Sequence, residues 1–311
     1  MPKLDGGAIG TAFGYQIDKM TDTVGFEDST HTYFDLKDGS RYISCTQLIH
    51  KYVPEYDEKW WSKYKALQRL SGERFNKYKS QLLQTKKITE EILFDLNITE
   101  EELKSEQLVV LKEWGQKRKE SCERGERIHK EWEDKFYENK NNPVKQFGIG
   151  GKLDCYKGKW KLQENGIYPE FMISFTTNDG YLKTVGQADL IICDNGEVTI
   201  VDHKTNAKIE KNGFFNSKTK TRECLKFPLN HIENSSYWIY TLQMSLYGVM
   251  IEYNYPKLKV KKLILNHIDH DGVQTLLECP YLKEDVERML LHYRKENKKK
   301  ILLEKDKPIV W

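Results

Sequence analysis

The feature that most constrains the fold is a pair of strand-like segments between residues 184 and 205. The segments "TVGQADLIICD" and "EVTIVDHKT" are rich in β-branched and apolar residues, and Asn195-Gly196 lies between them. Asn-Gly is the preferred dipeptide of a two-residue hairpin turn, so the sequence predicts two antiparallel strands in a fixed register. If the strands pair through this turn, Asp189 and Asp202 approach one another, although each lies in an apolar run.

The rest of the chain indicates an α/β protein. From about residue 147 the pattern predicts the order β-β-β-α-β-β-α, with a long apolar helix over 234–253 and an amphipathic helix over 283–300. Residues 57–138 are highly charged with helical periodicity, and the part from 105 onward reads as one helix, or as two with a break near Gly115 or Gly125. We predict an N-terminal hairpin and helical cover over residues 1–120 and a core over 121–311.

Two expectations concern the N-terminal residues. Residues 1 to about 28 are Gly-rich and weakly patterned, which predicts a loose lead-in. Residues 31–45 alternate around Asp38-Gly39, which predicts a β-hairpin.

Composition limits the classes of partner and cofactor. The net charge of +3 is nearly balanced, so a nucleic-acid surface must be local; the basic segment 292–300 is one candidate, and an ordinary solvated helix end is the alternative. The six cysteines are scattered singly without a CxxC pair, which argues against a zinc knuckle or a compact iron–sulfur ligand set. No apolar run approaches the roughly 20 residues that span a bilayer, and no signal peptide is recognisable, so we expect a cytoplasmic protein without a membrane partner.

The tripeptide Asp202-His203-Lys204 is weak evidence alone, because Asp-x-Lys also occurs at residues 35–37 and 57–59. Context distinguishes it: on a strand Asp202 and Lys204 point to the same side, and Asp189 lies one hairpin away. Clustered carboxylates repel unless a proton or a cation lies between them, and Mg²⁺ or Mn²⁺ prefers carboxylate oxygens. The alternative is a cross-strand Asp–Lys ion pair on an exposed face.

Two helices add further candidates. Gly125, His129 and Glu133 recur at spacings of four and therefore share one helix face, as do Gln243 and Tyr247. An ordinary surface histidine and a core tyrosine are the simpler interpretations. A competing metal site at "NHIDHDG", residues 266–272, is better explained as a polar hairpin tip.

The order G-x-x-x-H-x-x-x-E, G-x-A-D, D-x-K-T, Q-x-x-x-Y, over residues 120–250, resembles the RecB-type branch of the PD-(D/E)XK nuclease superfamily. That branch includes phage exonucleases and the mitochondrial genome maintenance exonuclease. The resemblance implies a restriction-endonuclease-like core, a central mixed β-sheet flanked by helices. It also implies roles for individual residues: metal binding by His129, Asp189, Asp202 and the carbonyl of His203; catalysis by Asp189, Asp202 and Lys204; and support or DNA contact by Glu170, Gln243, Tyr247, Arg124 and Arg127.

The implied activity is a Mg²⁺- or Mn²⁺-dependent deoxyribonuclease, most simply an exonuclease on single-stranded or frayed DNA ends, in a bacterial cytosol or a phage-infected host. Its partners would be DNA and a replication or recombination protein. Relatives with an iron–sulfur cluster carry a close cysteine group after the core, where this chain has only Cys279, so we expect no cluster. The alternatives are a flap endonuclease, a non-catalytic DNA-binding protein and a replisome adaptor on a nuclease scaffold.

Overall fold

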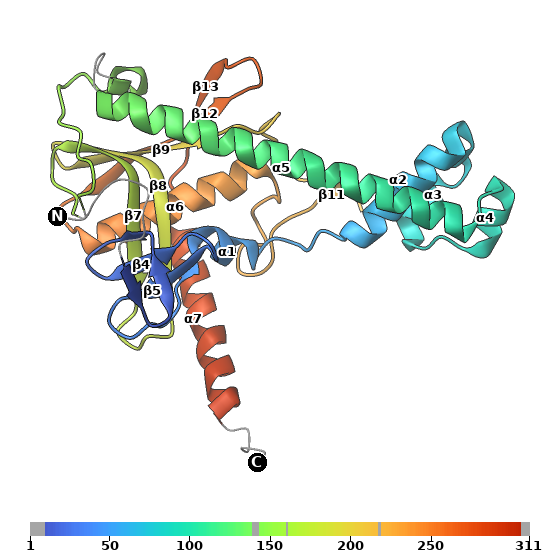
Figure 1. Cartoon of the computed structure of the whole chain (residues 1–311), viewed down its shortest axis with the longest axis horizontal. Helices are drawn as coiled ribbons and strands as arrows, with labels where there is room; N and C mark the ends of the chain where they lie inside the picture. The colour runs from blue at the N-terminus through green and yellow to red at the C-terminus, as the bar shows by residue number, and fades with distance from the viewer. Residues whose placement is uncertain (1–9, 139–142, 160, 217–218, 306–311) are drawn as a thin grey trace. The chain divides into compact units, whose positions relative to one another are not determined.

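The structure is a computed structural model that describes residues 10–138, 143–159, 161–216 and 219–305 (Figure 1). The chain forms two compact units, one made of Met1–Pro54 with Ile128–Trp311 and the other of Glu55–Arg127. The N-terminal strands therefore belong with the sheet, whereas the sequence placed them with the helices. The proposed role of the helices as a cover stays a prediction.

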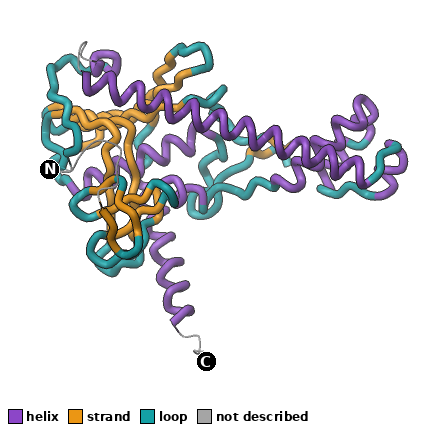
Figure 2. Tube along the Cα trace, viewed as in Figure 1, coloured by secondary structure: helices purple, strands orange, loops and turns teal. Residues whose placement is uncertain are grey.

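The first unit is α/β and is built on a six-stranded mixed sheet (Figure 2). Strand β8 pairs antiparallel with β7 and β9, and β9 pairs parallel with β12, whose other neighbour is the antiparallel β13. The short β6 pairs parallel with β8. The strands of this sheet are β6 (Ile43–Ser44), β7 (Gly166–Thr176), β8 (Lys183–Asp194), β9 (Glu197–Lys204), β12 (Lys259–Ile268) and β13 (Gln274–Cys279).

Helices cover both faces of this sheet because its strands are apolar on both sides. Along β8, Ile191 and Cys193 pack with helices α1 (Cys45–His50), α6 (Ser236–Asn254) and α7 (Lys283–Lys305). The alternating residues Leu190 and Ile192 pack against the end of helix α5 (Glu100–Glu138) and the 3-10 turn η2 (Pro143–Phe147). The predicted mixed sheet flanked by helices is thus confirmed, and His129 and Gln243 approach it from opposite faces.

The N-terminal residues form more structure than the sequence suggested. Residues 10–27 contain four strands, so the prediction of a loose lead-in is wrong there, and its residues 1–9 lie outside the described part. The predicted hairpin over 31–45 is short, because a few residues after the turn its second arm pairs with β8 instead. The N-terminal strands are β1 (Gly10–Ala12), β2 (Tyr15–Ile17), β3 (Lys19–Met20), β4 (Val24–Glu27) and β5 (Thr32–Asp35).

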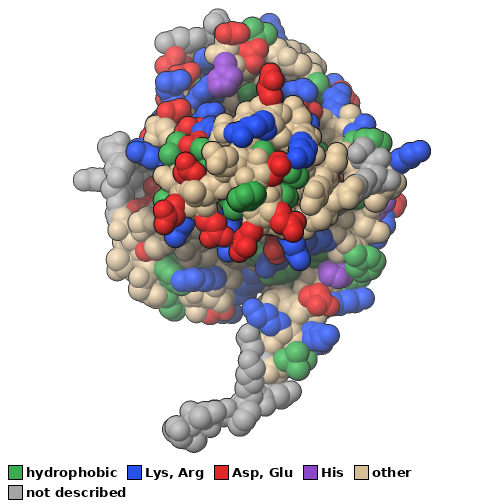
Figure 3. Space-filling model, turned by 90° about the vertical axis from the view of Figure 1, so that its right-hand side faces the viewer, with side chains coloured by type: hydrophobic (Ala, Val, Ile, Leu, Met, Phe, Trp, Pro, Cys, Tyr) green, Lys and Arg blue, Asp and Glu red, His purple; other side chains and the backbone are tan. Residues whose placement is uncertain are grey.

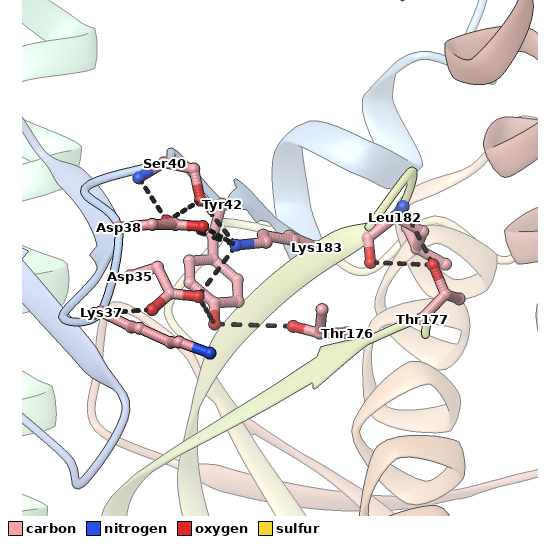
Figure 4. Close-up of polar contacts among 9 residues, drawn as sticks. All are labelled: Asp35, Lys37, Asp38, Ser40, Tyr42, Thr176, Thr177, Leu182 and Lys183. Carbon is pink, nitrogen blue, oxygen red and sulfur yellow. Dashed lines mark hydrogen bonds and ion pairs between the residues drawn. The ribbon is translucent and has the colours of Figure 1, made fainter. Parts of the chain in front are cut away.

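An ion cluster joins these strands to the main sheet (Figure 4). Lys183 at the start of β8 contacts Asp35 at 2.9 Å and Asp38 at 3.2 Å, and it donates to Ser40 Oγ at 2.6 Å. Tyr42 extends the cluster, because its hydroxyl lies 3.3 Å from Asp35.

The second unit is helical, as predicted, with its own core around Leu67, Phe75 and Leu96. Helix α5 continues without a break at Gly115 and Gly125, although glycine disfavours helix by about 1 kcal/mol. Apolar residues along α5 pack in both units, which accounts for its continuity. The other helices of this unit are α2 (Glu58–Ser71), η1 (Gly72–Lys77), α3 (Lys79–Thr85) and α4 (Glu90–Leu96).

The surface carries a further small hairpin and a mixed distribution of charge. A small hairpin, β10 (Phe215–Asn216) and β11 (Thr221–Arg222), precedes α6. On the face drawn in Figure 3, acidic and basic side chains are interspersed, in agreement with the nearly balanced net charge. Among the described helices, none is both long and apolar enough to cross a bilayer.

Candidate metal centre

Two of the candidate carboxylates lie where the pairing of β7 and β8 is interrupted. The strands are in register as Pro169↔Leu190 and as Phe171↔Ala188, but Glu170 and Asp189 between them are not paired. Glu170 has φ of 49°, an unusual value for a non-glycine residue inside a strand, and one that often marks functional sites. Asp189 lies within β8, inside the strand that the sequence predicted.

His129 of α5 completes a group of three possible metal ligands. Its Nδ1 lies 3.4 Å from Asp189 Oδ1 and 3.9 Å from Glu170 Oε1. One ligand atom from each residue lies within 4.8 Å of the others, so a single ion can touch all three. One nitrogen and two carboxylate oxygens suit a divalent cation such as Mn²⁺, Mg²⁺ or Zn²⁺ without identifying it.

Asp202 and Lys204 form a second, adjoining part of the site on β9. The Lys204 Nζ atom lies 2.6 Å from Asp202 Oδ2, and the Asp202 side chain is almost fully buried. Tyr240 of α6 lies beneath the ammonium, whose nitrogen is 4.9 Å from the ring centroid, and the Tyr240 hydroxyl donates to Asn206 Oδ1 at 2.9 Å. The lysine is therefore held in place on two sides.

His203 connects the two parts. Its backbone N–H donates to Asp189 Oδ2 at 2.6 Å, which fixes the carboxylate of β8 against β9. Its buried ring lies 3.0 Å from the amide nitrogen of Asn266, its register partner on β12, and packs 4.9 Å from the Trp132 ring. Burial lowers the pKa of His203 to about 4, so the imidazole is neutral at pH 7.

The charges of the site are coupled. Burial opposes protonation of His129, but the negative charge of Asp189 outweighs it and raises the pKa of His129 to about 10. Burial acts to raise the pKa of Asp189, yet the adjacent His129 lowers it overall. Burial raises the pKa of Asp202 to about 6 and also raises that of Glu170. Among the described residues, these three carboxylates have two cationic side chains, His129 and Lys204, in ion-pair contact, so the site has room for added positive charge.

The predicted pair Gln243 and Tyr247 supports the site from α6. Gln243 Nε2 donates to the Tyr247 hydroxyl at 2.8 Å, and both line a cavity of about 310 Å³ beside Gln187. Gln187 in turn donates to Glu170 Oε2 at 2.6 Å. The buried Tyr247 ring approaches β8 so closely at Gly186 that an added Cβ would lie 2.4 Å from it. This contact requires glycine in the G-x-A-D motif.

The structure brings most of the predicted site residues together. His129, Glu170 and Asp189 form the possible ligand group, while Asp202 lies outside that group in its ion pair with Lys204. The ligand role of Asp202, and that of the His203 carbonyl, therefore stays a prediction. Glu170, to which the sequence gave a supporting role, belongs to the possible ligands.

Other predicted residues lie elsewhere. Glu133, on the same face of α5 as His129, instead contacts Lys130 at 3.3 Å. Arg124 and Arg127 lie on α5 within the unit Glu55–Arg127, and their contact with DNA stays a prediction. In the 266–272 segment, Asp269 Oδ1 accepts from the backbone N–H groups of Asp271 and Val273, which is the polar hairpin tip that the sequence favoured.

Sequence reasoning missed Gln187 and Asn266. Gln187 lies two residues before Asp189 in the G-x-A-D motif, and that spacing in a strand was a usable signal. Asn266 is a fully buried amide within the apolar strand "KLILNHI", and an isolated amide in such a strand signals a specific polar partner.

Comparisons with known proteins add little to this geometry. No protein-family model matches the chain, and no curated protein matches it. The crystal structure of SSO0001 is 17% identical with a TM-score of 0.24; the match covers 42% of this chain and half of SSO0001. A candidate exonuclease from Eubacterium rectale is 11% identical with a TM-score of 0.29, covering 84% of this chain and 80% of its own. TM-scores this low do not support a functional assignment, so any functional proposal depends on the site itself.

Proposed function

We propose that this chain is a divalent-metal-dependent nuclease with a PD-(D/E)XK-type site, acting as an exonuclease on single-stranded or frayed DNA ends. The observation that carries the proposal is the group His129, Glu170 and Asp189 beside the buried ion pair of Asp202 and Lys204. A structural role explains this arrangement poorly, because three carboxylates beside two cations destabilise one another in the absence of a ligand.

Each residue has a defined task in this proposal. His129, Glu170 and Asp189 hold the ion, which when bound polarises a phosphoryl oxygen and lowers the pKa of a bound water. Burial opposes the charge of Lys204, but Asp202 and Asp189 raise its pKa, so its ammonium stays charged. It is thus able to stabilise negative charge that develops on the phosphate. Asp202 orients the ammonium from 2.6 Å.

Supporting residues keep this geometry fixed. The N–H of His203 holds Asp189, and Gln187 holds Glu170, so two of the three possible ligands have a hydrogen bond that orients them. Such bonds to ligand side chains commonly contribute 10- to 100-fold, in approximate terms, to metal affinity or activity. The preference for DNA and for free ends rests on the order of the sequence motifs.

The test is degradation of end-labelled linear and circular single-stranded DNA in Mg²⁺, Mn²⁺ or EDTA. We expect metal-dependent loss of the linear substrate, persistence of the circle, and cleavage slower by about 10²-fold or more in Asp202→Ala and in Lys204→Ala. Cleavage of the circle would identify an endonuclease with the same chemistry. Wild-type rates in either variant would remove the site assignment.

A further inference from the structure

Two large aromatic residues lie at the start of the β10–β11 hairpin, and neither belongs to a hydrophobic core cluster among the described residues. The Phe214 side chain is 66% exposed and that of Phe215 is 50% exposed. Adjacent residues on a strand point to opposite faces, so the hairpin presents one phenylalanine on each side. Exposed aromatic rings on which bases stack are a feature of proteins that bind single-stranded nucleic acid.

The two faces of the hairpin differ in charge. Phe215 is the register partner of Arg222, and cross-strand partners share a face. The Arg222 guanidinium lies over the Phe215 ring at 5.7 Å from its centroid, and Lys220 lies two residues before it. On the opposite face, Glu223 lies beside Phe214. The Glu223 N–H donates to the Phe214 carbonyl at 2.9 Å. Arg222 Nε also lies 3.8 Å from Glu233 Oε1. One face therefore carries an aromatic ring and an ion-paired arginine, and the other carries an aromatic ring and an acid.

Hydrogen bonds hold the cationic face in position. Arg222 Nη1 donates to the Gly213 carbonyl at 3.0 Å, and the Gly213 N–H donates to Glu233 Oε2 at 2.8 Å. The guanidinium is thus fixed over the ring in the absence of any ligand. A fixed aromatic platform loses little conformational entropy when it binds.

The segment before the hairpin contacts the start of α6, the helix that covers the candidate lysine. The Tyr237 N–H, in the first turn of α6, donates to the Glu210 carbonyl at 3.0 Å. Tyr240, which covers Lys204, follows three residues later, about 4.5 Å along the helix axis. The chain that leaves β9 after Lys204 thus runs through the hairpin to the start of α6. It enters α6 within about one helical turn of Tyr240, the residue that covers Lys204.

We propose that the face formed by Phe215 and Arg222, together with Lys220 in the turn before β11, binds single-stranded nucleic acid that extends from the metal centre. An unpaired base stacks on Phe215, and the two cations contact the adjoining phosphates. Stacking suits any base, because every base has a π-face, but it requires bases that are not already stacked in a duplex. The inference rests on the proposed nuclease function for the direction of the strand, whereas binding itself is tested without cleavage.

The test measures binding of a fluorescein-labelled oligo(dT) of about 15 nucleotides by fluorescence anisotropy in EDTA. Phe215→Ala is expected to raise Kd by about 5- to 100-fold, and Phe215→Trp to preserve binding. Phe214→Ala is the matched control, because it removes the same ring from the acidic face and is expected to leave Kd unchanged. An abasic strand of equal length is expected to bind wild type and Phe215→Ala alike.

The cations are tested by salt dependence. Lys220→Gln is expected to reduce the slope of log K against log salt by about 0.7, the value for one phosphate contact on a single strand. The inference is overturned if wild type does not bind oligo(dT), or if Phe215→Ala binds as tightly as wild type. If Phe215→Ala both cleaves and binds as wild type does, the proposed binding surface is refuted and the proposed nuclease is not. Binding through Phe215 without any cleavage supports it and refutes the proposed nuclease.

Discussion

Two strands of this chain end in the same Asp-x-Lys pattern, yet their aspartates have opposite surroundings. On β9, Asp202 and Lys204 both lie within the strand, so their side chains share a face and meet at 2.6 Å. Strand β5 ends at Asp35, and there the backbone N–H of Lys37 donates to the Asp35 carboxylate at 2.9 Å. The chain turns at that point, and Asp35 pairs instead with Lys183 of β8 (Figure 4).

The difference extends to the neighbouring charges. Around Asp35, the ammonium of Lys183 is shared by two aspartates and Ser40, and hydrogen bonds satisfy both carboxylates. Around Asp202, the carboxylate of Asp189 acts from the adjoining β8, and Glu170 of β7 lies in turn beside Asp189. An Asp-x-Lys tripeptide is therefore a candidate catalytic pair only where the strand continues through it and where further carboxylates lie beside it.

The largest expected effect comes from replacing each of the two lysines by alanine. Lys204→Ala is expected to lower kcat of DNA hydrolysis by about 10²- to 10³-fold, because it removes a fixed charge from the developing transition state. Lys37→Ala is expected to leave kcat unchanged. Both are measured on end-labelled single-stranded DNA with saturating Mn²⁺. Equal losses in the two variants would show that the strand context does not distinguish them.

Metal affinity tests the excess of carboxylates directly. Glu170→Gln is expected to weaken Mn²⁺ binding by about 10-fold or more, because it neutralises one possible ligand while keeping its shape. Asp35→Asn is the matched control, since Lys183 already neutralises that carboxylate. Isothermal titration calorimetry measures both. A loss of affinity in Asp35→Asn, with none in Glu170→Gln, would move the metal site to the N-terminal cluster.

Much of the sheet was predictable from local pattern. Strands β7, β8, β9 and β12 and helices α6 and α7 lie where periodicity and turn residues placed them, because apolar runs and the Asn195-Gly196 turn act over short distances. The approach of Asp189 to β9 followed from the same turn. The small sheet of β3, β4 and β5 did not, because its strands are too short for a periodic signal.

The parts of the site that escaped prediction depend on long-range pairing. The interruption at Glu170 and Asp189 results from how β7 meets β8, and no local pattern marks a positive φ at a glutamate. The partner of Asp35 is Lys183, far along the chain, and no local pattern marks that pair. The Asn266–His203 contact required the register of β12 on β9, which sequence alone leaves open.

Strand β8 serves both aspartate clusters, and Gly186 lies between them. Its missing Cβ would lie 2.4 Å from Tyr247 Cε1 and 2.8 Å from Cys45 Sγ. Gly186→Ala is therefore expected to lower the free energy of unfolding by about 1–3 kcal/mol, measured by urea denaturation. Gly115→Ala on α5, where an added Cβ meets nothing within 4 Å, is expected to stabilise by about 0.5–1 kcal/mol. Destabilisation by Gly115→Ala alone would contradict this account of β8.

The stability of the N-terminal aspartate cluster is expected to depend on pH. Lys183→Met is expected to lower the free energy of unfolding by about 2 kcal/mol at pH 7, through loss of the half-buried contact with Asp35. Hydrogen bonds from Ser40, and then Lys183, lower the pKa of Asp38 to about 2. Burial acts to raise the pKa of Asp35, but its bonds from Lys183 and from the Lys37 N–H lower it overall.

A carboxyl whose pKa is lower in the folded chain stabilises the fold above its unfolded pKa, about 3.9 for aspartate. That stabilisation disappears as the pH falls through the folded pKa. The difference between wild type and Lys183→Met should therefore be full at pH 7 and shrink between about pH 4 and pH 2, while Lys37→Met shows no such change. Urea denaturation at pH 7, 4 and 2.5 measures it. A difference that persists undiminished at low pH would mean that Lys183 stabilises the fold by packing, and that its charge contributes nothing to the joint between the N-terminal strands and the sheet.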